Sequence, residues 1–282
     1  MSEARRRAIR VMTWNIHGAL GRNPRFDLQK VVALILRADP DIVALQEVDS
    51  RRQAGVDPFV MLRDALGHYG VGAKTIVTAD GGYGQMLMSR WPLRDIEIRD
   101  ISYGEFEPRR AIQACIETPQ GALHVAGTHL GLSIRERQSQ VRVLLDIIGE
   151  RTPFVLLGDF NDWFWPGSVR RVLAKVLPGR SRHRTFPSAC PLLRLDRIYC
   201  RPRGALIQSW TDREAREISD HLPCIGDLII APEEGEMTMH PATTSLAVRE
   251  TENPASGRAS HSTRDAGSTS VPLRIDLSDY GK

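Results

Sequence analysis

Polar side chains of a few chemical types stand at the ends of several predicted buried strands. Carboxylates, amides and imidazoles at such positions are the groups with which a scaffold holds a metal ion, orients a water molecule and stabilises negative charge. One polar residue beside a strand is unremarkable, but polar residues at several strand ends are hard to explain by chance. The candidates are Asn15 after 11–14, Glu47 after 42–45, His129 after 123–127, Asp159 and Asn161 after 155–157, Asp196 before 197–199, and Asp220 and His221 before Leu222.

Three of these residues offer oxygen atoms of the kind that a hard divalent cation prefers. Glu47 and Asp220 supply carboxylates, and Asn15 supplies an amide oxygen. Magnesium keeps several of its waters and leaves positions for a phosphate, whereas a buried Glu47 without a charge partner would be costly. We therefore predict a magnesium site, with manganese as a possible substitute. Zinc is not expected, because there is no HExxH motif and the cysteines are scattered.

The remaining candidates fit the hydrolysis of a phosphoester by a metal-positioned water. A water nucleophile needs a carboxylate to orient or deprotonate it, which suits Asp159. The negative charge that develops needs donors, which suits Asn161, His129 and a protonated His221. A carboxylate that is hydrogen-bonded to one imidazole nitrogen fixes the tautomer and raises the pKa of the ring, and Asp196 is the natural partner for His221 in that role.

Hydrophobic periodicity predicts the elements that position these side chains. Apolar residues recur at helical spacing over 26–37 and 134–148, and shorter helices are expected over 58–66 and 168–177. Short β-prone runs separated by Gly and Pro are expected over 71–125. Further strands are predicted over 9–14, 41–46, 154–157, 197–199, 205–210 and 224–230.

Helices that interleave with two groups of strands suit two packed β-sheets with helices on their outer faces. The predicted fold class is therefore α/β, a four-layer α/β/β/α sandwich. After residue 230 the chain becomes rich in Ser, Thr, Pro, Glu and Gly, a composition that buries too little apolar area to fold. The expected organisation is a flexible N-terminus at 1–8, a folded domain with the site at 9–230 and a disordered tail at 231–282.

The formal net charge of +4 is unevenly distributed. Residues 231–282 carry 8 acidic and 5 basic side chains, which leaves a net charge of +7 on the rest of the chain. A basic body favours an anionic partner such as a phosphate ester, nucleic acid or lipid headgroup, although solvated arginine faces are an equally good explanation. Peripheral contact with an anionic membrane or with nucleic acid is thus expected.

The N-terminus, the apolar runs and the cysteines indicate the cellular compartment of the protein. The N-terminus has no apolar stretch of the kind that a secretory signal contains, and no apolar run is long enough to cross a membrane. The four cysteines form no CxxC pair and are expected to be small buried hydrophobic residues, as in a reducing compartment. We expect a cytoplasmic monomer without a transmembrane segment.

Taken in order, six segments resemble motifs of the endonuclease/exonuclease/phosphatase superfamily, which has the DNase I-like fold. Each motif alone is weak, but six in the right order make the pattern specific. The resemblance covers residues 10–230. The segments are TWNIHG at 13–18, LQEVD at 45–49, GTHLG at 127–131, LLGDFND at 156–162, LDRIY at 195–199 and SDHLP at 219–223.

The resemblance implies a Mg²⁺-dependent phosphoric ester hydrolase with its catalytic domain at 9–230. Glu47 matches the main metal ligand of the family, and Asn15 matches an auxiliary one. Asp159 and Asn161 match the pair that orients the attacking water and steadies the phosphoryl group.

Further roles follow from the same resemblance. His221 matches the histidine that contacts the scissile phosphate, with Asp196 as its partner and Asp220 near the metal. His129 matches a second phosphate-facing histidine, which branches that cut DNA at abasic sites usually lack.

Two substrate-binding candidates lie in less well-matched segments. GGYGQMLMSR at 81–90 resembles a family element in which Asn is common where this chain has Gln85, whose amide could still reach a phosphate. EPRRA at 107–111 resembles a stretch of the lipid-related and small bacterial branches, so Arg109 or Arg110 could bind a phosphate oxygen, and Arg110 is the predicted contact. A surface salt bridge explains either arginine equally well.

The substrate is less defined than the reaction. The compact chain resembles the phosphodiesterase and sphingomyelinase-like side of the superfamily, and the Arg-rich segment 180–184 could hold a phosphate chain or an anionic membrane surface. Trp163 and Trp165 could stack on a base, line an apolar wall or pack a loop. The alternatives are an endonuclease or exonuclease acting on DNA or RNA, and a non-catalytic interaction module that has kept the fold.

Overall fold

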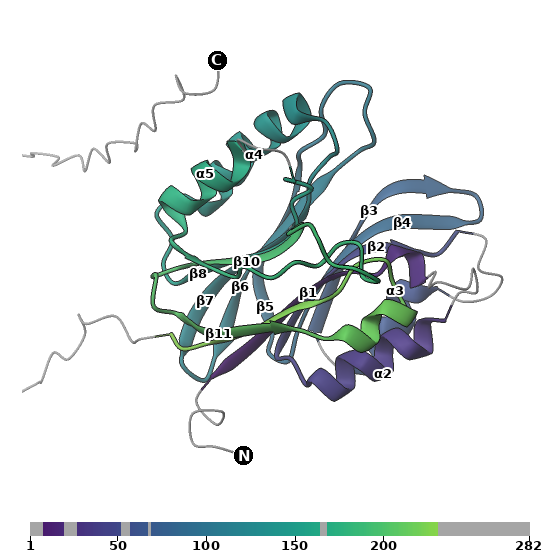
Figure 1. Cartoon of the computed structure of the whole chain (residues 1–282), viewed down its shortest axis with the longest axis horizontal. Helices are drawn as coiled ribbons and strands as arrows, with labels where there is room; N and C mark the ends of the chain where they lie inside the picture. Colours follow the sequence, from purple (N-terminus) through teal and green to yellow (C-terminus); the bar gives the residue numbers. More distant parts are fainter. Residues whose placement is uncertain (1–7, 20–26, 52–56, 67–68, 164–167, 231–282) are drawn as a thin grey trace, which may run out of the picture. The chain divides into compact units, whose positions relative to one another are not determined.

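The computed structural model describes residues 8–19, 27–51, 57–66, 69–163 and 168–230, which belong to one compact unit, Met1–Pro232. The described strands form two six-stranded sheets (Figure 1). The first sheet has the order β11 (Leu206–Thr211), β12 (Cys224–Leu228), β1 (Ile9–Asn15), β2 (Ile42–Asp49), β4 (Gly81–Ser89) and β3 (Tyr69–Thr78). The second has the order β5 (Leu93–Asp100), β6 (Arg110–Thr118), β7 (Gly121–His129), β8 (Phe154–Asp159), β10 (Asp196–Arg201) and β9 (Gly179–Arg180).

Helices cover the outer face of each sheet. Helices α2 (Leu28–Ala38) and α3 (Pro58–Leu66) lie beside the first sheet, and α4 (Ile134–Ile148) and α5 (Ser168–Val176) lie beside the second (Figure 1). Short 3-10 turns, η1 (His17–Ala19) and η2 (Arg213–Glu217), follow β1 and β11. The predicted four-layer arrangement is therefore confirmed.

Two hydrophobic layers hold the sandwich together. One fills the space between the sheets and includes Val11 and Ile42 from the first sheet and Val125 and Val155 from the second. The other lies between the first sheet and its helices. It joins Met12, Trp14, Val43 and Leu45 to Val31, Leu34, Ile35 and Leu62. Because neighbouring strand residues point to opposite faces, β1 and β2 supply both layers and read as almost continuous apolar runs.

The strand directions bring the candidate residues to one edge. β1 runs parallel to β2, with Asn15 opposite Gln46, and β7 runs parallel to β8, with His129 opposite Asp159. β10 runs antiparallel to β8, so that its first residue, Asp196, lies opposite Asp159. Parallel strands end at the same side of a sheet, and the two sheets are packed together. Residues that follow these strands can therefore meet.

Most predicted elements agree with the structure, with some differences. Helices α3 and α4 match the predicted 58–66 and 134–148, whereas α2 begins later than predicted because the Asp27 side chain accepts a hydrogen bond from the Lys30 amide and caps the helix. The glycine-rich stretch 81–85 lies within strand β4, which is longer than predicted.

Other expectations concern termini and cysteines. Cys115, Cys200 and Cys224 are buried as predicted, but Cys190 is exposed, so the prediction was wrong for that residue. The tail at 231–282, and all of the N-terminal segment except Ala8, lie outside the described residues.

Candidate functional site

Glu47 reaches the site because strand β2 is irregular where it sits. The pairing of β2 with β4 shifts register between Leu45 and Val48, which is the signature of a β-bulge. Within the bulge Glu47 has a φ of 56°, a left-handed conformation that costs free energy outside glycine. Bulges re-aim side chains, and this one turns the Glu47 carboxylate toward the end of β1.

Asn15, the last residue of β1, links two carboxylates from different sheets. Its Nδ2 donates to Glu47 Oε1 at 2.8 Å and to Asp159 Oδ2 at 3.1 Å, while its Oδ1 accepts from the His17 amide at 3.0 Å. Burial alone would raise the pKa of Glu47, but hydrogen bonds from His17 and Asn15 outweigh it and lower the pKa to about 2. Glu47 is therefore a carboxylate at neutral pH.

His17 was not predicted as a site residue, yet it lies beside two of the predicted ligands. Its Nδ1 is 3.5 Å from Glu47 Oε2 and 3.7 Å from Asp220 Oδ1, and its side chain is half exposed. The pKa of His17 is raised, mainly by its hydrogen bond with Glu47. The only sequence signal was its place two residues after Asn15, in η1.

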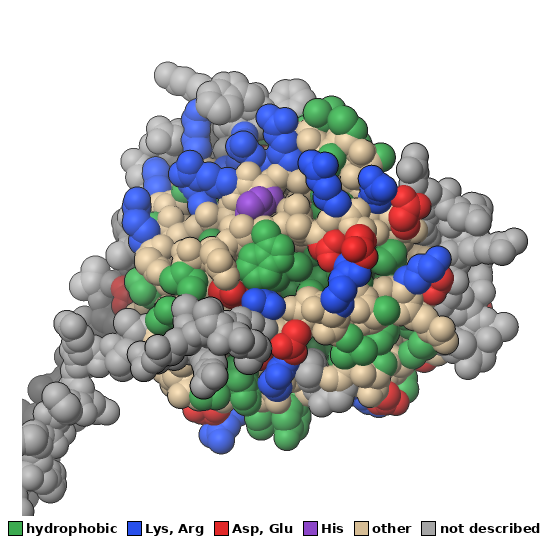
Figure 2. All heavy atoms as spheres, turned by 60° about the horizontal axis from the view of Figure 1, so that its bottom comes forward, with side chains coloured by type: hydrophobic (Ala, Val, Ile, Leu, Met, Phe, Trp, Pro, Cys, Tyr) green, Lys and Arg blue, Asp and Glu red, His purple; other side chains and the backbone are tan. Residues whose placement is uncertain are grey.

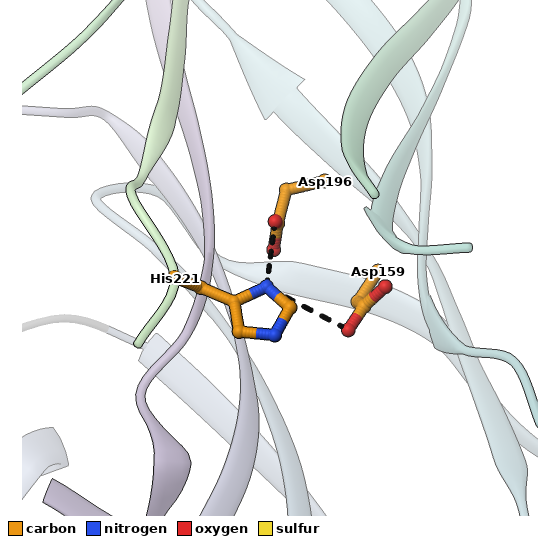
Figure 3. A group of neighbouring side chains, drawn as sticks. All are labelled: Asp159, Asp196 and His221. Carbon is orange, nitrogen blue, oxygen red and sulfur yellow. Dashed lines mark hydrogen bonds and ion pairs between the residues drawn. The ribbon is translucent and has the colours of Figure 1, made fainter. Parts of the chain in front are cut away.

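The second half of the site centres on His221, shown in Figure 3. His221 Nδ1 donates to Asp196 Oδ2 at 2.8 Å and lies 3.9 Å from Asp159 Oδ2. All three side chains are buried. Burial alone would lower the pKa of His221, but the charges of Asp196, Asp159 and Asp220 and the hydrogen bond to Asp196 raise it to about 10. The ring is therefore an imidazolium, and its Nε2 makes no hydrogen bond to a described residue.

The pKa of Asp159 is raised as well. Its burial, together with the charge of Asp196, raises the pKa of this carboxyl above the ordinary aspartate range. Oδ1 accepts from the Asn161 amide at 2.9 Å, and Oδ2 accepts from Asn15. Asn161 reaches this position with a φ of 48°, which makes it another left-handed residue in the site. A carboxylate held in this way is a stronger base than an exposed one.

Neighbouring groups fix the position of His221. The Trp14 indole donates to the His221 carbonyl at 2.9 Å, and the Ser219 hydroxyl accepts from the His221 amide at 3.1 Å. The same hydroxyl donates to the Asn15 carbonyl at 2.7 Å, and the Phe186 ring lies 4.8 Å from the imidazole. The SDHLP segment is thus tied to the end of β1.

His129 is buried and neutral. Its Nε2 faces Asn161 Nδ2 at 3.3 Å and Asp159 Oδ2 at 3.6 Å, and its Nδ1 faces Arg109 Nη1 at 3.5 Å. Burial and the charge of Arg109 lower the pKa of His129 to about 3. One ring nitrogen of the neutral imidazole still carries a proton and can act as a donor.

Arg109 and Arg110 point to different places. Arg109 is buried, donates to Glu107 at 2.7 Å and approaches His129, and its Nε is buried without a hydrogen-bond partner among the described residues. Arg110 is half exposed and faces Asp100 at 3.9 Å, away from this cluster. Gln85 is buried, and its amide donates to the Arg110 carbonyl, so it joins β4 to β6. The structure therefore brings Arg109 to the site, but neither Arg110 nor the Gln85 nitrogen.

Two groups of donor atoms could hold a divalent cation. The carboxylates of Glu47 and Asp220 both face His17 Nδ1, at 3.5 and 3.7 Å, and with the Asn15 amide, whose Oδ1 accepts from the His17 amide, they are the oxygen-rich group predicted from the sequence. Asp220 Oδ1 is buried with no hydrogen-bond partner among the described residues. Such an atom fits a cation, because an unsatisfied buried oxygen is costly. Asp159, Asp196 and His221 have ligand atoms that all lie within 4.8 Å of one another. The proton on His221 offsets one of the two carboxylate charges of that second group.

The aromatic residues after β8 take no direct part in this cluster. Trp163 is partly exposed, and Arg137 stacks on its ring at 5.1 Å. Trp165 lies outside the described residues. Within the described part of the chain, no helix is long and apolar enough to cross a membrane.

Comparison with known proteins places the chain among relatives of the same architecture. It is 31% identical to the Escherichia coli (strain K12) protein named "Uncharacterized protein YbhP" over 249 residues, covering 78% of this chain and 96% of that protein. A Beutenbergia cavernae endonuclease/exonuclease/phosphatase structure aligns with a TM-score of 0.65 at 22% identity, covering 80% of this chain and 72% of that one.

Two structures of named enzymes show the same fold. The human Nocturnin catalytic domain aligns with a TM-score of 0.60 at 22% identity, covering 80% of this chain and 94% of that one. The Bacteroides thetaiotaomicron mannosyl-6-phosphatase Bt3783 aligns with a TM-score of 0.61 at 17% identity, covering 79% and 100%. Residues 12–221 match the Endonuclease/Exonuclease/phosphatase family. This matched range includes all the residues of the cluster. The chain belongs to the Endonuclease/Exonuclease/phosphatase family.

Proposed function

We propose that this chain hydrolyses a phosphodiester by attack of a water molecule on phosphorus, with a divalent cation, Mg²⁺ or Mn²⁺, held by Glu47, Asn15 and Asp220. Family membership supports phosphoester hydrolysis in general. The observation that carries the specific proposal is the opposed protonation of two adjacent groups. Asp159 is a buried base and His221 is a protonated donor, 3.9 Å apart.

Neighbouring groups whose environments keep their pKa values well apart, so that one is a base and the other a protonated donor at the same pH, are a mark of acid–base assignments in enzymes. Asp159 would orient the water and take its proton, since Asn15 and the Asn161 amide hold both of its oxygens in place. A bound divalent cation would polarise the phosphoryl group and offset its charge.

The donors would then meet the negative charge that builds on the phosphoryl oxygens. His221 Nε2–H would donate to one oxygen, with Asp196 keeping the ring protonated and oriented. Asn161 and the neutral His129 lie next to Asp159 and would contact the same group. Arg109, whose Nε has no partner among the described residues, would supply a planar guanidinium in place of the predicted Arg110.

The experiment is a turnover assay of the purified protein on an aryl phosphodiester, with Mg²⁺ or Mn²⁺ and with chelator. We expect metal-dependent turnover, lost at least about a hundredfold in Glu47→Gln and in His221→Asn. Matched controls are Glu117→Gln, at an exposed position of β6, and His124→Asn, at a partly buried position of β7. A folded wild-type protein that binds metal yet turns over no phosphoester would instead favour a non-catalytic module.

A further inference from the structure

The chain between β8 and β11 is strongly basic. Residues 163–203 contain ten Lys or Arg side chains and one acidic residue, Asp196, which is hydrogen-bonded to His221. Figure 2 shows Lys and Arg side chains gathered along the upper left of the face that it draws. Seven of the ten are exposed and make no ion pair with any described residue: Arg171, Lys175, Arg180, Arg182, Arg184, Arg194 and Arg203.

Several exposed arginines elsewhere in the described chain pair with acidic side chains. Arg37 pairs with Asp212, Arg63 with Asp64, and Arg90 with Asp39. Their charges are therefore largely compensated by acidic neighbours. Exposed arginines without an ion pair to a described residue also occur elsewhere, for example Arg135 and Arg142, but in 163–203 seven such cationic side chains lie in one segment.

Three of the unpaired arginines form a regular row. Arg180, Arg182 and Arg184 are exposed. Ser181, which lies between the first two, and Thr185, which follows the third, are buried. This alternation is that of an extended chain, in which every second side chain faces the same way. Residues two apart in such a chain are separated by roughly 7 Å. We call these three residues the arginine row.

Backbone hydrogen bonds hold the row in place. The Ser181 amide donates to the Ile198 carbonyl at 2.9 Å, and the Thr185 amide donates to the Leu193 carbonyl at 2.7 Å. The Ser181 hydroxyl also accepts from the Ile198 amide at 2.9 Å. The row is therefore a fixed feature along the β9 edge of the second sheet.

The row ends at the proposed active site. Thr185, next to Arg184, accepts a hydrogen bond from the Asp196 amide at 3.2 Å, and the next residue, Phe186, packs against the His221 ring. Arg194 lies at the other end of this loop. Burial, and then the charges of nearby arginines that include Arg184 and Arg182, lower the pKa of Arg194, which indicates crowded positive charge.

We propose that the arginine row, together with Arg194, binds the phosphate backbone of a nucleic-acid strand and leads that strand to the site at His221. The inference rests on the proposed phosphoester hydrolysis and names its substrate class. A row of guanidinium groups at regular spacing matches the repeating phosphates of a single strand, and arginine forms bidentate bonds with phosphate.

Two other anionic substrates fit the row less well. A small phosphoester held at His221 could not contact Arg180, which is five residues of extended chain from Thr185, or roughly 17 Å. A membrane surface would favour apolar side chains among the cations. Within the described part of 163–203, Trp163 and Leu192 are the exposed large hydrophobic residues, and neither lies within the arginine row. The charge pattern therefore favours a nucleic-acid strand.

The test is binding of a fluorescein-labelled DNA strand of about 20 nucleotides, measured by anisotropy in EDTA so that the strand is not cut. The test variant is R180Q/R182Q/R184Q. The control, R63Q/R135Q/R142Q, removes the same charge from exposed positions on α3 and α4. We expect the test variant to bind at least about tenfold more weakly, and its slope of log K against log salt to fall by about 2, since each lost contact with a single strand removes about 0.7.

Several results would overturn this inference. Wild-type protein that does not bind the strand would do so, as would equal losses in the two triple variants. Binding of phosphatidylglycerol vesicles through the row, without binding of the strand, would assign the row to a membrane surface. Because binding in EDTA requires no turnover, its failure is distinguishable from failure of the aryl phosphodiester assay.

Discussion

The Asp196 carboxylate accepts a 2.8 Å hydrogen bond from His221 Nδ1, and both side chains are buried. The pair joins the first strand residue of β10 to a loop that leads into β12, so it connects the two sheets. Because of this pair, His221 keeps its proton at pH values at which an exposed histidine would lose it. The remaining nitrogen is then a fixed donor.

Replacement of Asp196 by Asn should remove the charge that keeps His221 protonated. We expect the pKa of His221 to fall and phosphodiesterase kcat to drop by about a hundredfold or more. Proton NMR titration of the imidazole and a pH profile of kcat measure the two effects. Asp146→Asn, at an exposed position on α4, is the control. An unchanged His221 titration in Asp196→Asn would contradict this account of the pair.

The activity should depend on pH with two limbs. The carboxyl of Asp159 has a raised pKa, so the rate should rise as this group loses its proton above the ordinary aspartate range of roughly 4. The pKa of His221 is raised to about 10, so the rate should fall as pH passes that value. Steady-state kcat/KM from pH 4 to 11 reports both limbs. An alkaline limb near 6.5, the ordinary histidine value, would exclude the protonated donor.

Stability should also respond to His221. Because its folded pKa is raised, the stability from its protonation is fully present below the unfolded value of about 6.5 and is lost as pH rises through about 10. The free energy of unfolding should therefore decline across this window by at most about 1.4 kcal/mol per pH unit from this group. Urea unfolding at several pH values should show a flatter curve for His221→Asn. Identical slopes in the two proteins would argue against the shift.

Metal binding should depend on Glu47 more than on any other single residue. We expect Glu47→Gln to weaken Mn²⁺ binding by tenfold or more, because it removes the fully ionised carboxylate of the oxygen-rich group. Isothermal titration calorimetry measures this directly and needs no turnover. Glu117→Gln should bind as wild type does. If Asp196→Asn abolished Mn²⁺ binding while Glu47→Gln left it intact, the metal would belong with Asp159, Asp196 and His221 instead.

Two adjacent arginines offer a sharp comparison. Arg109→Lys should raise KM and lower kcat/KM by about tenfold or more, because lysine cannot form a planar bidentate contact with phosphate. Arg110→Lys should have little effect, since its half-exposed side chain faces Asp100. Kinetics of both variants on one aryl phosphodiester decide between them. A larger effect at Arg110 would contradict the roles assigned here.

The helices, the strands and the residues at the strand ends could be predicted from the sequence better than the neighbouring residues that contact them. The run 134–148 had clear helical periodicity, and Ser133 with Glu136 forms a capping box at its start, so this helix was predicted to the residue. Asp159 and His221 were identified from their positions beside buried strands. The structure brings both into one cluster with Asn15, Glu47, His129, Asn161 and Asp196.

The choice between the two arginines depends on strand register. Arg109 and Arg110 are neighbours, and a shift of one residue exchanges the faces to which their side chains point. The register of β6 with β5, with Arg110 opposite Asp100, settles this choice and is not visible in one sequence. His17 was missed for a related reason. Its approach to Glu47 needs the bulge in β2 and a left-handed backbone at both residues.

In the proposed reaction, a water molecule positioned by Asp159 attacks phosphorus. The most direct test is hydrolysis of an aryl phosphodiester in oxygen-18 water, with mass spectrometry of both products, for wild type and Asp159→Asn. We predict one labelled oxygen in the phosphate monoester, none in the released alcohol, and loss of labelled product in Asp159→Asn. Label in the alcohol, or undiminished labelling of the monoester by Asp159→Asn, would contradict the proposed mechanism.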